Sequence, residues 1–232
     1  MARFGVEGTA PMIGIAGSGS RLLDFRPRSD PERAELRREF GQRDCAVITG
    51  FLEPAFLDEL LHAIDQSGFQ PRTHGHIGTE DSMEVGGPVA SLLLAANDPR
   101  LFEFVTDVTG CGAIGCFDGR VYRLDPAQGH GDSWHSDVGD NRLVAMSVNL
   151  TTERYEGGEL QIRDARSGRV TAEVGGTDAG DAVIFRIAER LRHRVSGVRG
   201  DVPRVAFAGW FKSAPSFRSV LAGGPWTAPE RM

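Results

Sequence analysis

The feature that most constrains this fold is a change of pattern at Gly110. Before it, apolar residues recur at helical spacing; after it, short β-type runs alternate with glycine, aspartate and proline as far as Lys212. Helices first and strands second predict a mainly β (α+β) domain in which helices brace one sheet of a sandwich or barrel. A chain of 232 residues can form such a domain as one unit.

The expected helices have recognisable start signals. Asp30, Pro31 and Glu32 predict a helix with Asp30 as its N-cap that runs to about Phe40. Further segments with helical spacing or an Asp-Pro start cover residues 53–66, 89–96 and 99–108. Between them, we expect the glycine-rich stretch 74–87 to be a polar loop.

The expected strands follow in the second half, with one early strand before them. They cover residues 45–49, 119–124, 142–150, 159–163, 169–174, 182–187 and 204–211. Ser167-Gly168 predicts a hairpin turn between two of them. We expect a single domain over residues 30–212, with a helical support at 30–110 and a β core at 111–212. A flexible N-terminal arm at 1–29 precedes it, and a peripheral tail at 213–232 follows it.

Composition excludes several classes of protein. A net charge of −6 argues against a nucleic-acid-binding surface. Residues 10–19 are too short and too rich in glycine for a membrane span, and the start lacks the apolar core of a signal peptide. Three cysteines do not form a disulfide framework. We therefore expect a cytoplasmic protein without a nucleic-acid or membrane partner; its oligomeric state stays open.

One tripeptide has the spacing of metal ligands. In an extended segment residues two apart point to the same side, so His135 and Asp137 can reach one ion together. His193 is the candidate for a third ligand from elsewhere in the fold. Two histidines and one carboxylate on one face of an octahedron leave positions open for a bidentate co-substrate and for oxygen on Fe(II).

The residues alone leave other interpretations open. A His-X-Asp tripeptide is common by chance, and each histidine could be a structural residue with a hydrogen-bond partner. His74-Gly75-His76 is a second possible metal-binding pair, without an obvious carboxylate at the same spacing. His62 lies in a helical pattern and is expected to be structural, and the default interpretation of His130 is a solvated loop residue.

The strand 204–211 strengthens the metal hypothesis. Its bulky face suits packing on a second layer and consists of Val205, Phe207 and Phe211. Its other face is small between an arginine and a tryptophan, and consists of Arg204, Ala206, Ala208 and Trp210. A buried guanidinium without an anion is costly, so an arginine facing the inside of a barrel predicts a bound carboxylate.

The strand 142–150 has a similar division. Its small polar face consists of Ala145, Ser147 and Asn149. That face fits the lining of a ligand cavity, and it fits equally a half-exposed strand with polar residues in water.

Together these residues resemble the Fe(II)/2-oxoglutarate dioxygenase superfamily, in its prolyl 4-hydroxylase-like branch. The resemblance covers roughly residues 119–212. Besides His135-X-Asp137, His193 and Arg204, it rests on the sequences Tyr155-Glu156-Gly157-Gly158-Glu159-Leu160 and Gly180-Asp181-Ala182-Val183-Ile184-Phe185.

The resemblance implies a double-stranded β-helix, or jelly roll, and an iron site formed by His135, Asp137 and His193. It implies that Arg204 binds the distal carboxylate of 2-oxoglutarate and that Asn149 lies near this co-substrate. No catalytic residues are implied beyond the metal ligands. The family consumes 2-oxoglutarate and O2 and releases succinate and CO2, and ascorbate can support the activity. Because Asp137 is present, the resemblance favours oxidation over halogenation.

Substrate identity is the open part of this interpretation. The resemblance favours hydroxylation of an unactivated C–H bond in an amino-acid, peptide or natural-product substrate, which Arg123 and Trp210 are candidates to contact. The same cofactors could support desaturation, epimerisation or ring formation. An alternative of another class is a non-catalytic jelly-roll protein that binds a metal or ligand. The loops 74–87 and 126–133 are candidates for covering the site.

Overall fold

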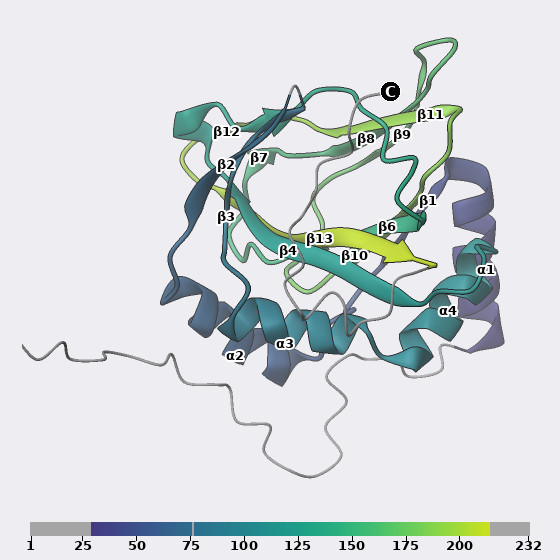
Figure 1. The fold of residues 1–232 in the computed structure, drawn as a ribbon, viewed down its shortest axis with the longest axis horizontal. Coiled ribbons are helices and arrows are strands. Elements are labelled where there is room, and N and C mark those ends of the chain that lie inside the picture. The colour runs from purple at the N-terminus through teal and green to yellow at the C-terminus, as the bar shows by residue number, and fades with distance from the viewer. Residues whose placement is uncertain (1–28, 76, 214–232) are drawn as a thin grey trace, which may run out of the picture.

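The computed structural model describes residues 29–75 and 77–213. In this part of the chain two antiparallel layers of strands face each other, and helices cover the outer side of the larger layer (Figure 1). The predicted arm and tail fall almost wholly on 1–28 and 214–232, outside the described residues. None of the helices described here is long and apolar enough to cross a membrane.

The helices precede most of the strands, as expected from the sequence. They are α1 (Asp30–Arg43), α2 (Pro54–Asp65), α3 (Gly87–Ala96), α4 (Pro99–Thr109) and the 3-10 turn η1 (Pro126–Gln128). The strands are β1 (Cys45–Ile48), β2 (Gln70–His74), β3 (Gly78–Ser82), β4 (Cys116–Leu124), β5 (Gly131–Asp132), β6 (Arg142–Asn149), β7 (Glu156–Gly157), β8 (Leu160–Asp164), β9 (Val170–Val174), β10 (Ala182–Arg186), β11 (Leu191–Val195), β12 (Val198–Arg199) and β13 (Arg204–Lys212).

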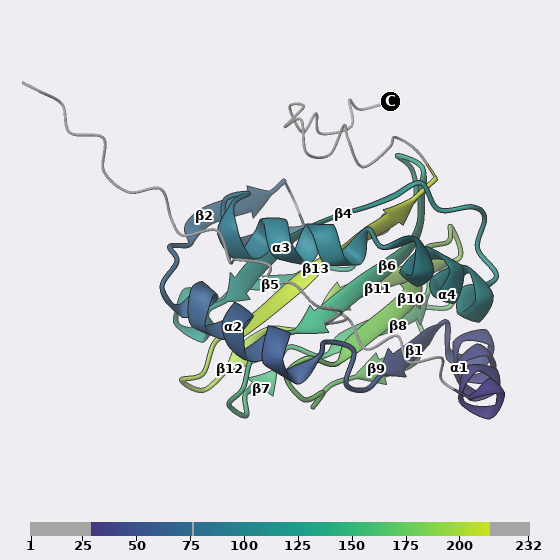
Figure 2. The same ribbon diagram turned by 90° about the horizontal axis from the view of Figure 1, so that it is seen from below.

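The larger sheet has the strand order β1-β10-β6-β13-β4-β3-β2, with β5 paired to β3. The opposite layer consists of the sheet β11-β8-β9 and the short pair β12-β7. Helices α2, α3 and α4 lie across the outer side of the larger sheet, and α1 lies at its β1 end (Figure 2). The hairpin predicted at Ser167-Gly168 is confirmed, because it joins the antiparallel strands β8 and β9.

The N-cap predicted for the first helix is one residue off. Asp30 is the first helical residue, and Ser29 is the cap, with its backbone N–H donating to the Glu32 carboxylate at 2.7 Å. Serine and aspartate are equally good caps, so their order alone does not decide between them. Of the three Pro-initiated helices that follow, α2 and α4 are capped by side chains, with Glu53 starting α2 and Asp98 starting α4.

The loop predicted over residues 74–87 is wrong in its first half. Strands β2 and β3 form an antiparallel hairpin there. The alternation that marks a strand is absent because both strands are polar, and β3 is joined to β4 partly by charged pairs: Glu80 with Arg120 and Asp81 with Arg123. Strand β11 was not predicted either, because its central inward position is the polar His193, so that the three middle residues are all polar.

The two-faced character of β13 is confirmed. Phe207 and Phe211 pack with Phe117 of β4 in the core between the larger sheet and the helices, with ring centroids of Phe117 and Phe211 4.8 Å apart. On the other face, Ala206 belongs to a separate apolar cluster with Val195 and Val198 of the opposite layer. The same strand therefore separates the apolar core from the interior between the two layers.

A glycine pair in the middle of the larger sheet makes the packing of this core possible. Gly209 of β13 lies directly opposite Gly119 of β4. A Cβ atom at Gly209 would lie 2.0 Å from the carbonyl oxygen of Asp118, and one at Gly119 would lie 2.6 Å from the Phe117 ring. Neither the paired backbone nor the buried ring can move without disturbing the core.

We therefore expect Gly209→Ala to lower the free energy of unfolding by about 1–3 kcal/mol through overpacking. The matched control is Gly41→Ala in α1, where nothing lies within 4 Å of the new methyl group and helix propensity favours alanine. Urea denaturation of both variants measures the effect. Equal stability of Gly209→Ala and the wild type would contradict the packing assigned to this glycine pair.

Candidate metal centre

Two histidines are joined across the two layers by their backbones. His135, in the connection between β5 and β6, forms an isolated antiparallel bridge with His193 of β11. The N–H of each residue donates to the carbonyl of the other at 3.0 Å. Residues directly opposite in such a pair have their side chains on the same face, so the two imidazoles are side by side, with ring centroids 4.3 Å apart.

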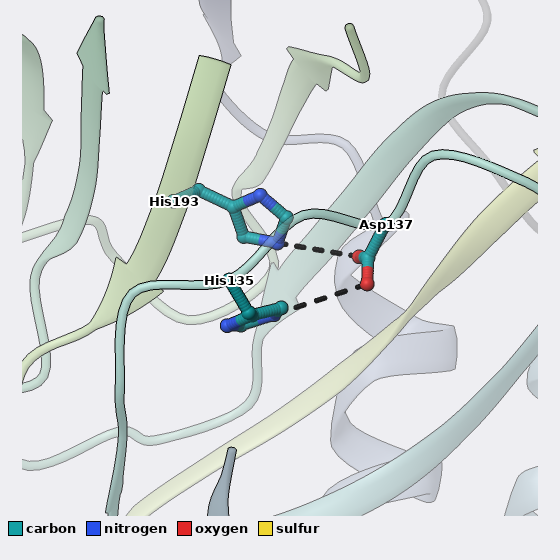
Figure 3. Close-up of side chains that lie close together, drawn as sticks. All are labelled: His135, Asp137 and His193. Carbon is teal, nitrogen blue, oxygen red and sulfur yellow. Dashed lines mark ion pairs between the residues drawn. The ribbon is translucent and has the colours of Figure 1, made fainter. Parts of the chain in front are cut away.

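Asp137 completes a cluster of three potential metal ligands. One nitrogen of each imidazole and a carboxylate oxygen of Asp137 all lie within 4.8 Å of one another. Figure 3 shows both rings directed at this carboxylate, with His193 Nε2 3.2 Å from Oδ2 and His135 Nε2 3.8 Å from Oδ1. The structure thus brings together the three residues that the sequence suggested.

The protonation of the cluster suits a divalent metal. Burial and the neighbouring His193 lower the pKa of His135, so its imidazole is neutral near pH 7. Its Nδ1 donates to the carbonyl of Ser133 at 2.8 Å, which leaves the lone pair on Nε2. Burial alone would raise the pKa of Asp137, but His193, His135 and Trp210 together lower it well below its usual range. Two imidazoles and one carboxylate are a donor set that fits Fe(II).

Trp210 contacts the candidate ligand Asp137. Its indole Nε1–H donates to Oδ2 of Asp137 at 2.6 Å. The guanidinium of Arg142 stacks on the indole at 3.9 Å from the ring centroid and approaches Oδ1 of Asp137 at 3.5 Å. The sequence suggested Trp210 as a substrate contact, and that role stays a prediction. Its contact in the structure is with the carboxylate, which it orients.

Arg204 lies buried on the same inner face of β13. Its Nη1 donates to the hydroxyl of Tyr122 at 2.8 Å and its Nη2 to Oγ of Ser147 at 3.2 Å. Its Nε has no hydrogen-bond partner, and no carboxylate pairs with it among residues 29–75 and 77–213. Burial opposes its charge, yet the pKa is raised because Tyr122 and Tyr155 lie close to it. This cation needs an anion that the described chain does not supply.

Two other predicted site residues have different surroundings. Both ends of the Asn149 amide bond to backbone: Nδ2 donates to the carbonyl of Thr177 at 2.8 Å, and Oδ1 accepts from the N–H of Thr151 at 3.1 Å. Arg123 pairs with Asp81 at 2.7 Å and stacks on Phe69, on the helix-covered face of β4. Neither is part of our proposal for ligand binding. Strand alternation could have indicated the orientation of Arg123, because it shares a face with the core residue Val121.

A charged group that the sequence analysis did not recognise lies on the inner face of β2, β3 and β4. The Glu80 carboxylate is buried and binds the guanidinium of Arg120 through both oxygens, at 2.6 and 3.0 Å. His74 Nε2 lies 2.9 Å from the same carboxylate. The proposed second metal pair therefore has His74 bound to an acid already paired with arginine, and His76 lies outside the described residues.

The remaining histidines have structural surroundings. His62 of α2 bonds to Gln66 in the next turn, as expected of a structural residue. His130 is buried and is not solvated as expected: its Nδ1 accepts from the N–H of Asp125 at 3.1 Å. Asp125 also caps the turn η1, so the first part of the loop 126–133 is fixed to the end of β4.

Comparison with protein families supports the chemistry suggested by this site. Residues 119–212 match the family model described as the 2OG-Fe(II) oxygenase superfamily. This segment contains the three clustered residues and Arg204. It also coincides with the region over which the sequence resembles that family. No curated protein matches the chain.

Solved structures share the fold at low identity. A prolyl-4-hydroxylase from Pseudomonas putida is 18% identical, covering 79% of this chain and 100% of that chain, with a TM-score of 0.59. A prolyl hydroxylase from Trichoplax adhaerens, in complex with a hypoxia inducible factor peptide fragment, is 16% identical, covering 83% and 92%, with a TM-score of 0.56. The epimerase SnoN from nogalamycin biosynthesis is 15% identical, covering 87% and 93%, with a TM-score of 0.58.

These findings confirm the fold and the family resemblance expected from the sequence. The two facing layers are the double-stranded β-helix of 2-oxoglutarate oxygenases, and the four helices brace its larger sheet. The family resemblance is borne out over residues 119–212, the segment that matches the family model.

The contact between Trp210 and Asp137 leads to a prediction about metal affinity. Trp210→Phe keeps an aromatic ring under Arg142 and removes only the N–H that orients the carboxylate. We expect metal binding to weaken by about 10–100-fold, as for other partners that orient ligands. Titration with Fe(II) under nitrogen measures it. The control is Trp134→Phe, because that ring lies between Arg163 and Arg194 and does not contact Asp137. Unchanged affinity in Trp210→Phe would show that the indole does not orient the ligand.

The buried Glu80 leads to a prediction about pH. Burial would raise its pKa, but His74 and Arg120 lower it from 4.5 to about 2. Because the folded-state pKa lies below the unfolded one, the pairing stabilises the fold above about pH 4.5 and is lost as the pH falls towards 2. We expect Glu80→Gln to cost about 3 kcal/mol at pH 7.

Denaturation of wild type and Glu80→Gln from pH 7 down to pH 3 tests this, because the stability difference should shrink over the acid part of that range. Glu59→Gln, at an exposed position on α2, is the control for the same chemical change. A difference that stays constant with pH would mean that the ion pair is not the source of the stability.

Proposed function

We propose that this protein is an Fe(II)- and 2-oxoglutarate-dependent oxygenase that hydroxylates an unactivated C–H bond of an amino-acid, peptide or natural-product substrate and releases succinate and CO2. The observation that carries the proposal is the buried Arg204. Its guanidinium has no carboxylate partner among the described residues, and it lies on the same strand as Trp210, which binds the candidate ligand Asp137. An anion bound at one end and a metal bound at the other match a chelating dicarboxylate.

The groups around Arg204 suit the distal carboxylate of 2-oxoglutarate. Arginine binds carboxylates through two parallel hydrogen bonds, and the cost of burying it is repaid only by such pairing. The hydroxyls of Tyr122 and Ser147 accept hydrogen bonds from Arg204, so each retains its own proton. Both could donate that proton to the same carboxylate. Arg204 would therefore fix the position and direction of the co-substrate.

His135, Asp137 and His193 would hold the iron. When bound together with 2-oxoglutarate, iron supplies the activation of O2 that oxidises the substrate. The protein's contribution is to orient and shield. The Ser133 carbonyl fixes the tautomer of His135, the Trp210 N–H orients the Asp137 carboxylate, and Phe185 contacts the His193 ring at 4.9 Å and keeps water from that side. No acid or base beyond the metal ligands is needed.

The outcome of the oxidation depends on where the substrate lies, and hydroxylation is our preferred assignment. Two of the similar structures are prolyl hydroxylases, and one of them binds a peptide. Epimerisation is a second outcome with the same cofactors, because another similar structure is an epimerase. The side chain of Asp137 directed at both imidazoles argues against a free site for halide.

We expect wild-type protein with Fe(II), 2-oxoglutarate, ascorbate and its substrate to form succinate with uptake of O2. His135→Ala should lose this turnover. Arg204→Met, which keeps the length of the side chain and removes the charge, should raise the 2-oxoglutarate concentration needed for half-maximal rate at least tenfold. Succinate formation and oxygen uptake, measured with a panel of amino acids and peptides, provide the test.

Arg199→Met is the control, because this exposed arginine on β12 lies outside the site. Binding of 2-oxoglutarate and Fe(II), measured separately by calorimetry, distinguishes a missing substrate from a wrong assignment. Protein that binds neither would rule out the oxygenase assignment and favour a non-catalytic binding protein with a jelly-roll fold.

A further inference from the structure

Beside the proposed metal site, charged side chains of β4 and β5 have a hydrogen-bond donor and a carboxylate that take no part in the proposed iron and 2-oxoglutarate sites. A guanidinium has five N–H donors. In Arg120, Nε and Nη2 bind the Glu80 carboxylate, and Nη1 makes no hydrogen bond to any residue in 29–75 or 77–213. The charge of Arg120 is therefore anchored, while one end of its fork stays available to a ligand.

The position of Arg120 places this free end next to the proposed chemistry. Arg120 lies opposite Ala208 of β13, on the inner face of the larger sheet. Its guanidinium carbon is 5.5 Å from the ring centroid of Tyr122, which binds Arg204, and 6.0 Å from that of Trp210, which binds Asp137. Arg120 thus lies between the proposed anchor of 2-oxoglutarate and the residue that orients a metal ligand.

Asp132 is the complementary group. It pairs with Gly78 across β5 and β3, so its side chain shares the inner face with that of Glu80. A Cβ atom at Gly78 would lie 3.0 Å from Oδ1 of Asp132, which shows that the carboxylate lies over this glycine. Within the described residues it forms no hydrogen bond or ion pair. Burial raises its pKa, and the nearby His135 and Arg120 counter this only in part.

Asp132 and Arg120 act on each other electrostatically, yet they do not form an ion pair. Asp132 is the last residue of β5, three residues before His135, which pairs with His193. A guanidinium with a free donor and a carboxylate without a partner therefore lie near each other, separated by more than the length of an ion pair, beside the proposed metal ligands. A ligand that carries both charges on neighbouring atoms can span such a gap.

We propose that Arg120 and Asp132 form a recognition subsite for a small zwitterion, a free α-amino acid whose carboxylate binds Nη1 of Arg120 and whose ammonium group binds Asp132. This inference rests on the proposed function and specifies its substrate class. An amino acid bound there would lie beside Trp210, which contacts the proposed metal ligand Asp137. Arg120 and Asp132 are specificity-determining residues and take no part in the oxidation.

A purely structural network is the competing explanation, and the unused groups argue against it. A network that only held the β2–β3 hairpin to β4 would be complete with Glu80, His74 and two of the Arg120 nitrogens. A second carboxylate without a partner adds nothing to it, because burying a charge without a partner destabilises a fold. An ammonium group bound to Asp132 would remove that cost.

The test uses the full chain with Fe(II) and 2-oxoglutarate under nitrogen, where binding occurs without turnover. Calorimetry with the twenty protein amino acids as free zwitterions should find at least one that binds. Its N-acetyl and C-terminal amide forms should bind at least tenfold more weakly, because each removes one charge. Asp132→Asn should weaken binding of the free amino acid at least tenfold and abolish the preference over the N-acetyl form.

Arg120→Lys keeps a positive charge beside Glu80 but replaces the forked guanidinium by a single ammonium group. It should therefore abolish the preference for the free carboxylate over the amide. Asp58→Asn, an exposed change on α2, is the control and should behave as the wild type. Each variant should still bind 2-oxoglutarate with unchanged affinity, which shows that it is folded.

The outcomes separate the two proposals. If 2-oxoglutarate and Fe(II) bind but no free amino acid does, or if the blocked forms bind equally well, the zwitterion subsite is wrong and the oxygenase assignment stands. If Asp132→Asn binds the free amino acid as the wild type does, the assignment of Asp132 is wrong. If neither 2-oxoglutarate nor metal binds, both proposals fail.

Discussion

The two backbone hydrogen bonds between His135 and His193 are the constraint on which the site depends. They join the connection that leads into the larger sheet to a strand of the opposite layer, and they fix the two imidazoles on one face. Asp137 then needs only the two-residue repeat of an extended chain to reach both rings. Because the bridge forms only when the layers close on each other, the cluster is a property of the folded domain and not of either segment alone.

Charge pairing on the inner face indicates where ligands belong. Arg120 has Glu80, and Arg142 has Asp137, so these cations are balanced by the chain itself. Arg204 and Asp132 are left without an ionic partner among the described residues. Unpaired charges in a half-buried interior are costly, so they persist where a ligand supplies the opposite charge. Arg204 marks the proposed binding site of the co-substrate, and Asp132 marks the proposed binding site of the substrate.

Sequence alternation predicted the two faces of β13 and the convergence of His135 with Asp137, because both follow from the two-residue period of a strand. Alternation could not predict that His193 lies beside them, because that contact is made between the two layers. The family resemblance supplied His193 as the third ligand. The prediction from the sequence failed mainly for strands made of polar residues. The hairpin that carries Glu80 has no apolar alternation, and single acids such as Asp132 give no local signal. Asn149 alternates in step with Ser147 on the inner face of β6, and both ends of its amide form hydrogen bonds with backbone groups outside that strand.

The uneven packing of the larger sheet explains how one fold can serve different substrates. Its centre, at β6, β13 and β10, is held by apolar clusters on both faces, so residues there cannot change without a loss of stability. Its edge at β2, β3 and β5 lies at the other end of the strand order and is held largely by ion pairs and backbone bonds. Changes at that edge alter which charges face the metal while the co-substrate end on β13 stays fixed. Substrate choice is therefore physically separable from oxygen activation in this domain.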